Sequence, residues 1–280
     1  MNTIINKHNE ATDDFLFHHS LATNCQDNTV YGPETHTQFE VLYLVKGEIE
    51  YVIEGVVYPV KQNDIIIVPP NEMHSIKIKS DDYERIVILF DYNIIEAMLQ
   101  KANITVDKTL FTNYYSYKIV QKDIVKDTNL KNIFFETAKL KNDALIRVKL
   151  ISYIMQLICE LSKTTSLEHI THVSPIDANE VVKNATAFIN ENITKPLSIE
   201  YIAKNIGVSK STLSHQFSSF MNVSLNKYIT IKKIYLARTL IRKGVSATEA
   251  CLTVGYSQYA TFYQNYCKYI GVCPSTNKPI

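Results

Sequence analysis

Two runs of polar side chains near the C-terminus have residue types that hydrogen-bond to nucleic acid. Each run follows a Gly-x-Ser tripeptide, the first beginning at Gly207 and the second at Gly255. Hydroxyl, imidazole and amide groups can bind base edges in a DNA groove, and ammonium groups can bind phosphates. The chemistry expected of these residues is therefore recognition of DNA and not catalysis.

The spacing of apolar residues indicates which of these side chains face outward. Leu213 and Phe217 are four residues apart, as are Phe262 and Tyr266. On a helix, each such pair forms one buried stripe. The outward positions in the first run are then Ser211, Ser214 and His215, flanked by Lys210 and Thr212. In the second run they are Tyr259, Ala260, Thr261, Tyr263 and Gln264.

Each run is the second half of a helix, turn, helix pattern. A short apolar-periodic segment precedes each glycine, and glycine permits the left-handed backbone that ends a helix. Ser209 and Ser257 can then cap the second helices. This pattern is the helix-turn-helix unit, whose second helix can enter a DNA major groove. Two copies favour this interpretation over the alternative of a helical bundle without DNA contact.

The segment from Leu197 to Pro274 resembles the DNA-binding domain of the AraC/XylS family of bacterial transcription regulators. The resemblance rests on Ala-x-x-x-Gly-x-Ser ending at Ser209, on a central helix from Tyr228, and on the runs 254–262 and 266–275. It implies that the outward positions contact bases and backbone of double-stranded promoter DNA. It also implies contact with RNA polymerase, because activation is the usual outcome in this family.

Positive charge is concentrated in this part of the chain. From Asp177 onward, 12 Lys/Arg and 5 Asp/Glu give a net charge of +7, whereas the preceding residues carry −6. However, His215 and Gln264 stand where family members usually have Arg, so we expect a single subunit to bind DNA weakly. Phosphate contacts are expected from the remaining basic residues, which are Lys204, Lys210, Lys227, Lys232, Lys233, Arg238, Arg242, Lys243 and Lys268.

The N-terminal half has the pattern of short strands. Residues before Tyr31 are polar and irregular, and then β-branched and aromatic segments alternate with Gly, Pro and polar turns. This spacing predicts an antiparallel sandwich or barrel. The strands are expected at residues 38–46, 49–54, 56–60, 65–68, 75–79 and 85–90.

Residues 36–90 resemble the cupin-like sensor domain that many members of the family carry. Metal-binding cupins use a His-x-His pair, then Glu and a later His, and the candidates here are His36, Gln38, Glu40 and His74. A His/His/Glu set could hold a divalent metal. Because Gln is a poor metal ligand, we expect a pocket without metal or cofactor, lined by His36, Glu40 and His74. Tyr43 is expected either to line the pocket or to lie in the core.

From Tyr92 the apolar period becomes helical. We expect helices at 94–101, 127–141 and 142–163, and an additional strand within 110–120. The apolar face of the third helix is wide, so the sheet or a second subunit must cover it. In the family, helices at this place often form the dimer interface. The polar segment near 164–175 is typical of a linker, and a first DNA-domain helix is expected at 177–192.

The sequence therefore predicts an α+β protein. A cupin-like antiparallel barrel with following helices (residues 1–165) and a linker (166–176) precede an all-α domain with two helix-turn-helix units (177–280). No long apolar run or signal peptide is visible, and the 5 Cys are scattered. We expect a cytoplasmic homodimeric activator that senses a small molecule and is not an enzyme. The alternatives are a cupin-type metal enzyme with an accessory helical domain and a cupin that is only a dimerisation scaffold.

Overall fold

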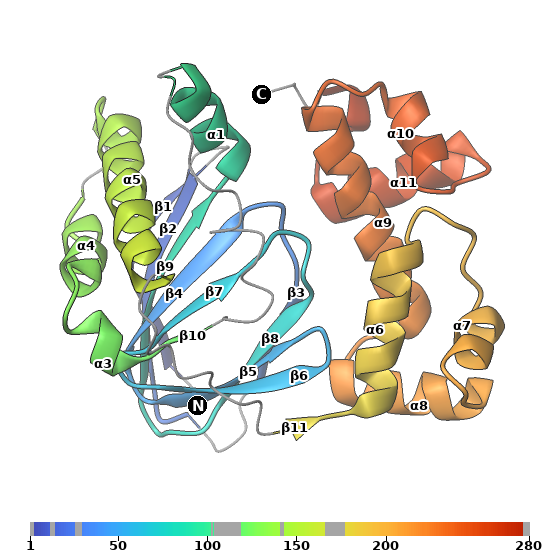
Figure 1. Cartoon of the computed structure of the whole chain (residues 1–280), viewed down its shortest axis with the longest axis horizontal. Coiled ribbons are helices and arrows are strands. Elements are labelled where there is room, and N and C mark those ends of the chain that lie inside the picture. The colour runs from blue at the N-terminus through green and yellow to red at the C-terminus, as the bar shows by residue number, and fades with distance from the viewer. Residues whose placement is uncertain are drawn as a thin grey trace. The chain divides into compact units, whose positions relative to one another are not determined.

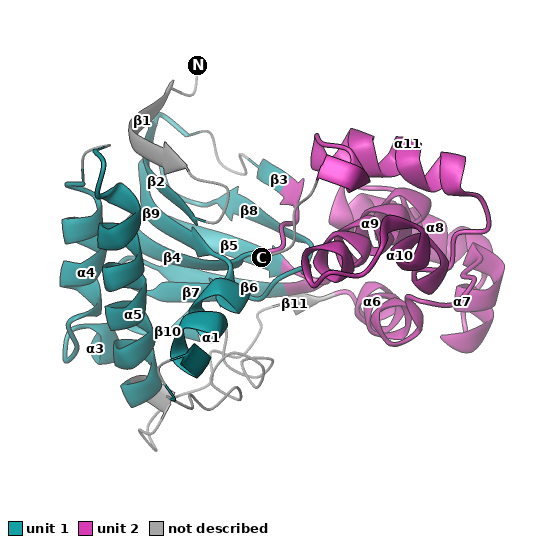
Figure 2. Ribbon diagram, turned by 90° about the horizontal axis from the view of Figure 1, so that it is seen from above, with its two compact units in different colours: residues 1–32, 38–52, 57–176 teal, residues 33–37, 53–56, 177–280 magenta. Residues whose placement is uncertain are grey.

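The computed structural model describes residues 3–11, 15–25, 30–101, 103, 119–140, 143–165 and 177–276. The chain divides into two compact units (Figure 2). The first comprises residues 1–32, 38–52 and 57–176, and the second comprises residues 33–37, 53–56 and 177–280. Strands dominate the first unit and helices dominate the second.

One sheet has the strand order β1-β2-β9-β4-β7-β10 (Figure 1). Its neighbouring strands are antiparallel. Val41 pairs with Ile88 on one side and with Ile67 on the other, so apolar side chains from three strands form one buried face. The strands are β1 (Thr3–Ala11), β2 (Phe15–Thr23), β4 (Phe39–Lys46), β7 (Ile65–Val68), β9 (Tyr83–Phe90) and β10 (Ile119–Val120).

A second sheet contains the neighbouring strands β6, β5, β8 and β3 in that order. Their bounds are β3 (Val30–Glu34), β5 (Glu48–Ile53), β6 (Val56–Lys61) and β8 (His74–Ile78). The antiparallel β domain predicted from the sequence is confirmed. Within the described residues, however, the strands form two sheets and do not close into one barrel.

The helices of the first unit are α1 (Tyr92–Lys101), α3 (Lys122–Val125), α4 (Leu130–Thr137) and α5 (Ile146–Thr165). Leu150, Ile154 and Leu157 of α5 share one core with apolar residues of α4 and of the first sheet, and Figure 1 shows α4 and α5 side by side. The apolar face of α5 is therefore covered within the chain, and only Leu145 and Val148 near its start remain largely exposed. Most of the segment 110–120, where a strand was expected, lies outside the described residues.

The interpretation of the N-terminal residues as irregular is wrong for β1, for β2 and for the start of β3. In β2, Phe15 and Phe17 are buried, while Leu16, His18 and His19 are half-buried. The polar composition of the segment made this alternation difficult to recognise in the sequence. The strand forms because β2 pairs with β1 and with the distant strand β9.

The helices of the second unit are α6 (Glu180–Asn192), α7 (Ile199–Asn205), α8 (Lys210–Met221), α9 (Leu225–Arg242), α10 (Ala247–Thr253) and α11 (Tyr259–Ile270), followed by the 3₁₀ turn η2 (Pro274–Thr276). Residues 177–178 form the short strand β11, so α6 begins later than predicted. The pairs α7–α8 and α10–α11 are the two predicted helix-turn-helix units, and α9 joins them (Figure 1).

Apolar contacts hold each helix-turn-helix unit on α9. Phe217 of α8 packs edge-on against Tyr228 with ring centroids 5.1 Å apart. Phe262 and Tyr266 of α11 share a buried cluster with Ile234 and Ala237. Within the part of the chain that the structure describes, no helix is long and apolar enough to cross a membrane.

Candidate nucleic-acid interface and ligand site

The first exposed helix face is that of α8. Ser209 caps the helix, because its Oγ accepts the backbone N–H of Thr212 at 3.0 Å. Leu213 and Phe217 are fully buried, as their spacing predicts. The outward positions are exposed or half-buried, and they are Lys210, Ser211, Thr212, Ser214 and His215. The polar side chains on this face of α8 therefore lie outside the apolar core of the unit.

Lys210 already has a protein partner on this face. Its ammonium group forms an ion pair with Glu200 of α7, and this pair holds the pKa of the Glu200 carboxyl below its ordinary value. Both side chains are well exposed, so the pair contributes little to stability. A phosphate could therefore replace Glu200 as the partner of Lys210.

The second exposed face belongs to α11. Phe262 and Tyr266 are fully buried. The residues outside this buried stripe are Tyr259, Ala260, Thr261, Tyr263, Gln264 and Lys268, all of them exposed. The prediction that Ser257 caps this helix is wrong, because Gln258 is the N-cap residue and its side chain makes no capping hydrogen bond.

The two turn glycines differ in their surroundings. Both have positive φ, 76° at Gly207 and 78° at Gly255. A Cβ at Gly207 would meet nothing within 4 Å, whereas one at Gly255 would lie 2.8 Å from the carbonyl oxygen of Thr194 and 2.9 Å from Lys233 Nζ. At Gly255, neighbouring atoms as well as the positive φ therefore disfavour a side chain, whereas at Gly207 only the positive φ does.

Three of the basic residues expected to contact phosphates are buried, which corrects the prediction. Lys233 Nζ donates to the carbonyl oxygens of Val254, at 2.8 Å, and Lys195, at 3.1 Å, and burial lowers its pKa. Lys232 Nζ donates to Glu54 of the segment 53–56 at 2.9 Å, and Arg242 is also buried. The exposed lysines of the predicted set are Lys204, Lys210, Lys227, Lys243 and Lys268.

Glu40 and His74 form a buried polar cluster in the sensor region. Tyr51 donates its hydroxyl to Glu40 Oε1 at 2.7 Å, and its ring stacks on the His74 ring. His74 Nδ1 donates to the carbonyl oxygen of Glu72 at 3.0 Å, which directs Nε2 toward Glu40 Oε2 at 3.5 Å. A proton or a cationic group between these two atoms would be stabilised by the carboxylate.

His36 is the third residue of the trio predicted from the sequence. His36 belongs to the segment 33–37 of the second unit, whereas Glu40 and His74 belong to the first unit. Such a set can bind a polar group of a small molecule, and its atom types are also those that bind a divalent cation.

The structure does not bring Tyr43 to this trio. On a strand, side chains alternate between faces, and Tyr43 is three residues from Glu40, so the two point to opposite sides. Tyr43 donates to Asn63 Oδ1 at 2.7 Å and stacks on Phe134, with centroids 5.4 Å apart. Burial raises its pKa to about 12. Tyr43 therefore belongs to the core shared with α4 and α5.

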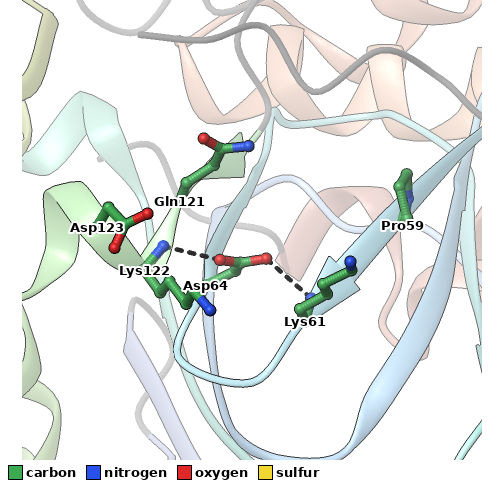
Figure 3. A pocket seen from close by; sticks show the side chains of 6 residues that line it. All are labelled: Pro59, Lys61, Asp64, Gln121, Lys122 and Asp123. Carbon is green, nitrogen blue, oxygen red and sulfur yellow. Dashed lines mark hydrogen bonds between the residues drawn. The ribbon is translucent and has the colours of Figure 1, made fainter. Parts of the chain in front are cut away.

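The sequence predictions missed a cavity of about 300 Å³ in the first unit (Figure 3). At its centre, the carboxylate of Asp64 accepts backbone N–H groups of Lys61 and Lys122, each at 2.8 Å. Burial raises the pKa of Asp64. The lining residues are Pro59, Lys61, Asp64, Gln121, Lys122 and Asp123. They come from segments far apart in the chain, which is why no local motif revealed them.

Two family models match the chain. The AraC-like ligand binding domain matches residues 17–158, and a helix-turn-helix domain matches residues 202–278. The chain therefore belongs to the AraC-type family of transcription regulators, which combine a ligand-binding domain with a helix-turn-helix DNA-binding domain. The matches give no support to the alternative of a cupin-type enzyme.

Three individual proteins show how far the similarity of sequence and fold extends. The chain is 28% identical to the lactose operon transcription activator of Staphylococcus xylosus, over 53% of this chain and 54% of that protein. It is 29% identical to the melibiose operon regulatory protein of Escherichia coli, over 41% and 38%. The chain thus matches about half of the first relative's length and less of the second's. Among solved structures, an apo variant of ToxT from Vibrio cholerae matches over 95% of this chain and 97% of its own, with 12% identity and a TM-score of 0.42.

Proposed function

We propose that the chain is a transcription activator that binds promoter DNA through α8 and α11 and responds to a small-molecule effector. The observation that supports this proposal is the pair of exposed helix faces on two helix-turn-helix units with α9 between them. At 18 residues, α9 is about 27 Å long, close to the roughly 34 Å between successive major grooves on one side of DNA.

The proposed contacts follow from exposure and side-chain chemistry. In α8, Ser211, Ser214 and His215 contact bases, while Lys210 and Thr212 contact the backbone. In α11, Gln264 makes the bidentate contact that favours adenine, and Lys268 binds a phosphate. The other contacts of α11 come from Tyr259, Ala260, Thr261 and Tyr263.

In this proposal, residues 1–165 form the sensor, 166–176 the linker and 177–280 the DNA-binding domain. The effector binds at His36, Glu40 and His74, and the buried pair of Glu40 and His74 supports this site. The protein acts as a homodimer in the cytoplasm and activates transcription by contact with RNA polymerase. The name of the lactose operon relative, an activator, agrees with this direction of regulation.

The test of DNA binding begins with genome-wide mapping of DNA bound by the full chain. The affinity of the purified protein for a mapped fragment is then measured by fluorescence anisotropy between about 50 and 200 mM salt. We expect affinity to fall steeply as salt rises, because phosphate contacts release counterions. A folded protein without salt-dependent DNA binding would show that the proposal is wrong.

The effector site is tested with three single substitutions, His36→Ala, Glu40→Ala and His74→Ala. We expect each to change the transcriptional response to the inducing condition and to leave DNA affinity unchanged. Tyr43→Phe serves as the control, since it removes only the hydroxyl bound to Asn63. A wild-type response in all three Ala variants would favour the dimerisation scaffold.

A further inference from the structure

Two cysteines and a tyrosine meet at the C-terminal end of α11. Cys267 lies in the last turn of the helix, and Cys273 follows Gly271, which ends the helix with φ of 82°. The two Sγ atoms are 3.5 Å apart, and the hydroxyl of Tyr263 is 3.0 Å from Cys273 Sγ. Both thiols are half-buried and thus reachable from solvent.

We propose that Cys267 and Cys273 are a modification site, at which a hydroperoxide converts the two thiols into a reversible disulfide next to the DNA-binding face of α11.

The geometry favours this bond over any other pairing of the described cysteines. The sulfur atoms already touch, and a disulfide needs them to approach by about 1.5 Å more. Cys273 lies beyond the end of the helix, so it can move without breaking the hydrogen bond from Gly271 N–H to the Cys267 carbonyl oxygen. Cys25 and Cys251 are buried, and Cys159 is exposed on α5 in the first unit.

The surroundings also identify the thiol that reacts first. The hydrogen bond from the Tyr263 hydroxyl, together with the one from Cys267, lowers the pKa of Cys273. Burial raises the pKa of Cys267, and the bond to Cys273 raises that of Tyr263 to about 12, so both remain donors. Because the thiolate is the nucleophile, Cys273 attacks first.

Each disulfide that forms consumes one hydroperoxide. The Cys273 thiolate forms an S–O bond as the O–O bond breaks, and for hydrogen peroxide the leaving hydroxide takes a proton to become water. The Cys267 sulfur, on losing its proton, attacks the resulting sulfenic acid. The S–S bond forms, the S–O bond breaks, and a second water leaves. A cellular dithiol reverses the reaction by thiol–disulfide exchange.

The disulfide changes the face of α11, and this step rests on the proposed function. Tyr263 lies on the exposed face beside Gln264, and its hydroxyl loses a thiolate acceptor when Cys273 is oxidised. We expect oxidation to weaken DNA binding by roughly three- to tenfold, the worth of about one hydrogen bond.

Peptide mapping of the full chain tests the modification without DNA. Trypsin cleaves after Lys268, so Cys267 and Cys273 fall on the separate peptides 244–268 and 269–280. Mild peroxide treatment should yield these two peptides cross-linked, in a form that dithiothreitol separates. The cross-link should vanish in Cys267→Ser and Cys273→Ser and persist in the controls Cys159→Ser and Cys251→Ala. Failure to form it in folded wild-type protein, or its persistence in Cys267→Ser, overturns the proposal.

DNA affinity is then compared between the reduced and oxidised full chain, with Cys267→Ser as the variant whose affinity should not respond to peroxide. If the reduced protein binds and the oxidised protein binds equally well, the consequence for DNA binding is wrong. If the reduced protein binds no promoter DNA, the proposed function fails, and peptide mapping alone decides the modification.

Discussion

At the scale of single residues, Lys233 shows how a basic side chain can stabilise a helical unit from within. Its ammonium group bridges the carbonyl oxygens of Lys195, just after α6, and Val254, at the end of α10. Helix ends leave carbonyl groups without intrahelical donors, and a buried carbonyl needs a donor from elsewhere. Lys233 is therefore a cross-link between two loops of the second unit.

We expect Lys233→Met to destabilise the protein by roughly 1–3 kcal/mol, because two carbonyl groups lose their donor. Far-ultraviolet circular dichroism during urea unfolding measures this loss. Lys268→Ala is the matched variant. It should leave stability unchanged and lower the salt dependence of DNA binding by about one unit. The assignment is wrong if Lys233→Met changes the salt dependence of DNA binding while leaving stability intact.

The turn glycines give a second residue-scale prediction. Gly207→Ala should destabilise by about 1–2 kcal/mol, because its left-handed backbone disfavours a Cβ. Gly255→Ala should destabilise further, by on the order of 1–3 kcal/mol, since the new Cβ also meets Thr194 and Lys233. Equal shifts of the urea midpoint in the two variants would contradict this difference.

Some residue-scale features could be predicted from the sequence and others could not. Helical periodicity correctly placed Leu213 and Phe262 inside and their polar neighbours outside. Strand parity would have separated Tyr43 from Glu40, because an odd spacing reverses the face. The burial of Lys233 has no such signal, since a lysine on α9 finds its carbonyl partners only after α6 and α10 have packed.

At the scale of elements, serine caps set where several helices begin. Side chains of Ser198, Ser209, Ser224 and Ser246 each accept a backbone N–H in the first turn of a helix of the second unit. Ser257 looks equivalent in sequence, but α11 begins one residue later, after Gln258. A one-residue shift of a helix start is beyond what a local pattern can resolve.

Ser209→Ala should therefore destabilise the protein by about 1 kcal/mol, while Ser257→Ala should change its stability very little. Urea unfolding followed by circular dichroism compares the two variants under identical conditions. Loss of stability in Ser257→Ala as large as that in Ser209→Ala would show that the serine caps α11 in solution.

The strand order is the element-scale feature that was hardest to predict from the sequence. All six predicted strands correspond to β4–β9, because each has its own apolar pattern and turn, and their bounds differ from the prediction by one or two residues at most. The hairpin of β1 and β2 lacks a comparable pattern, and its place beside β9 depends on pairs of residues that are 61 to 75 positions apart.

At the scale of the whole molecule, two different helix faces imply an asymmetric DNA site for one chain. We expect Gln264→Ala to relax base preference at one position of one half-element, at roughly 1–3 kcal/mol. His215→Ala should act only on the other half-element. Footprinting and a base-substitution series of the bound site measure both effects. The two-groove arrangement fails if both substitutions affect the same base pairs.

The single helix α9 has a consequence for how regulated promoters can change. A continuous helix of 18 residues keeps a fixed length, unlike a flexible linker that stretches to span a longer gap. About five base pairs inserted between the half-elements turn one of them to the far side of the duplex, and about ten restore the side but move it out of reach. Binding sites for this protein can therefore drift by base substitution, whereas insertions and deletions between the half-elements silence them.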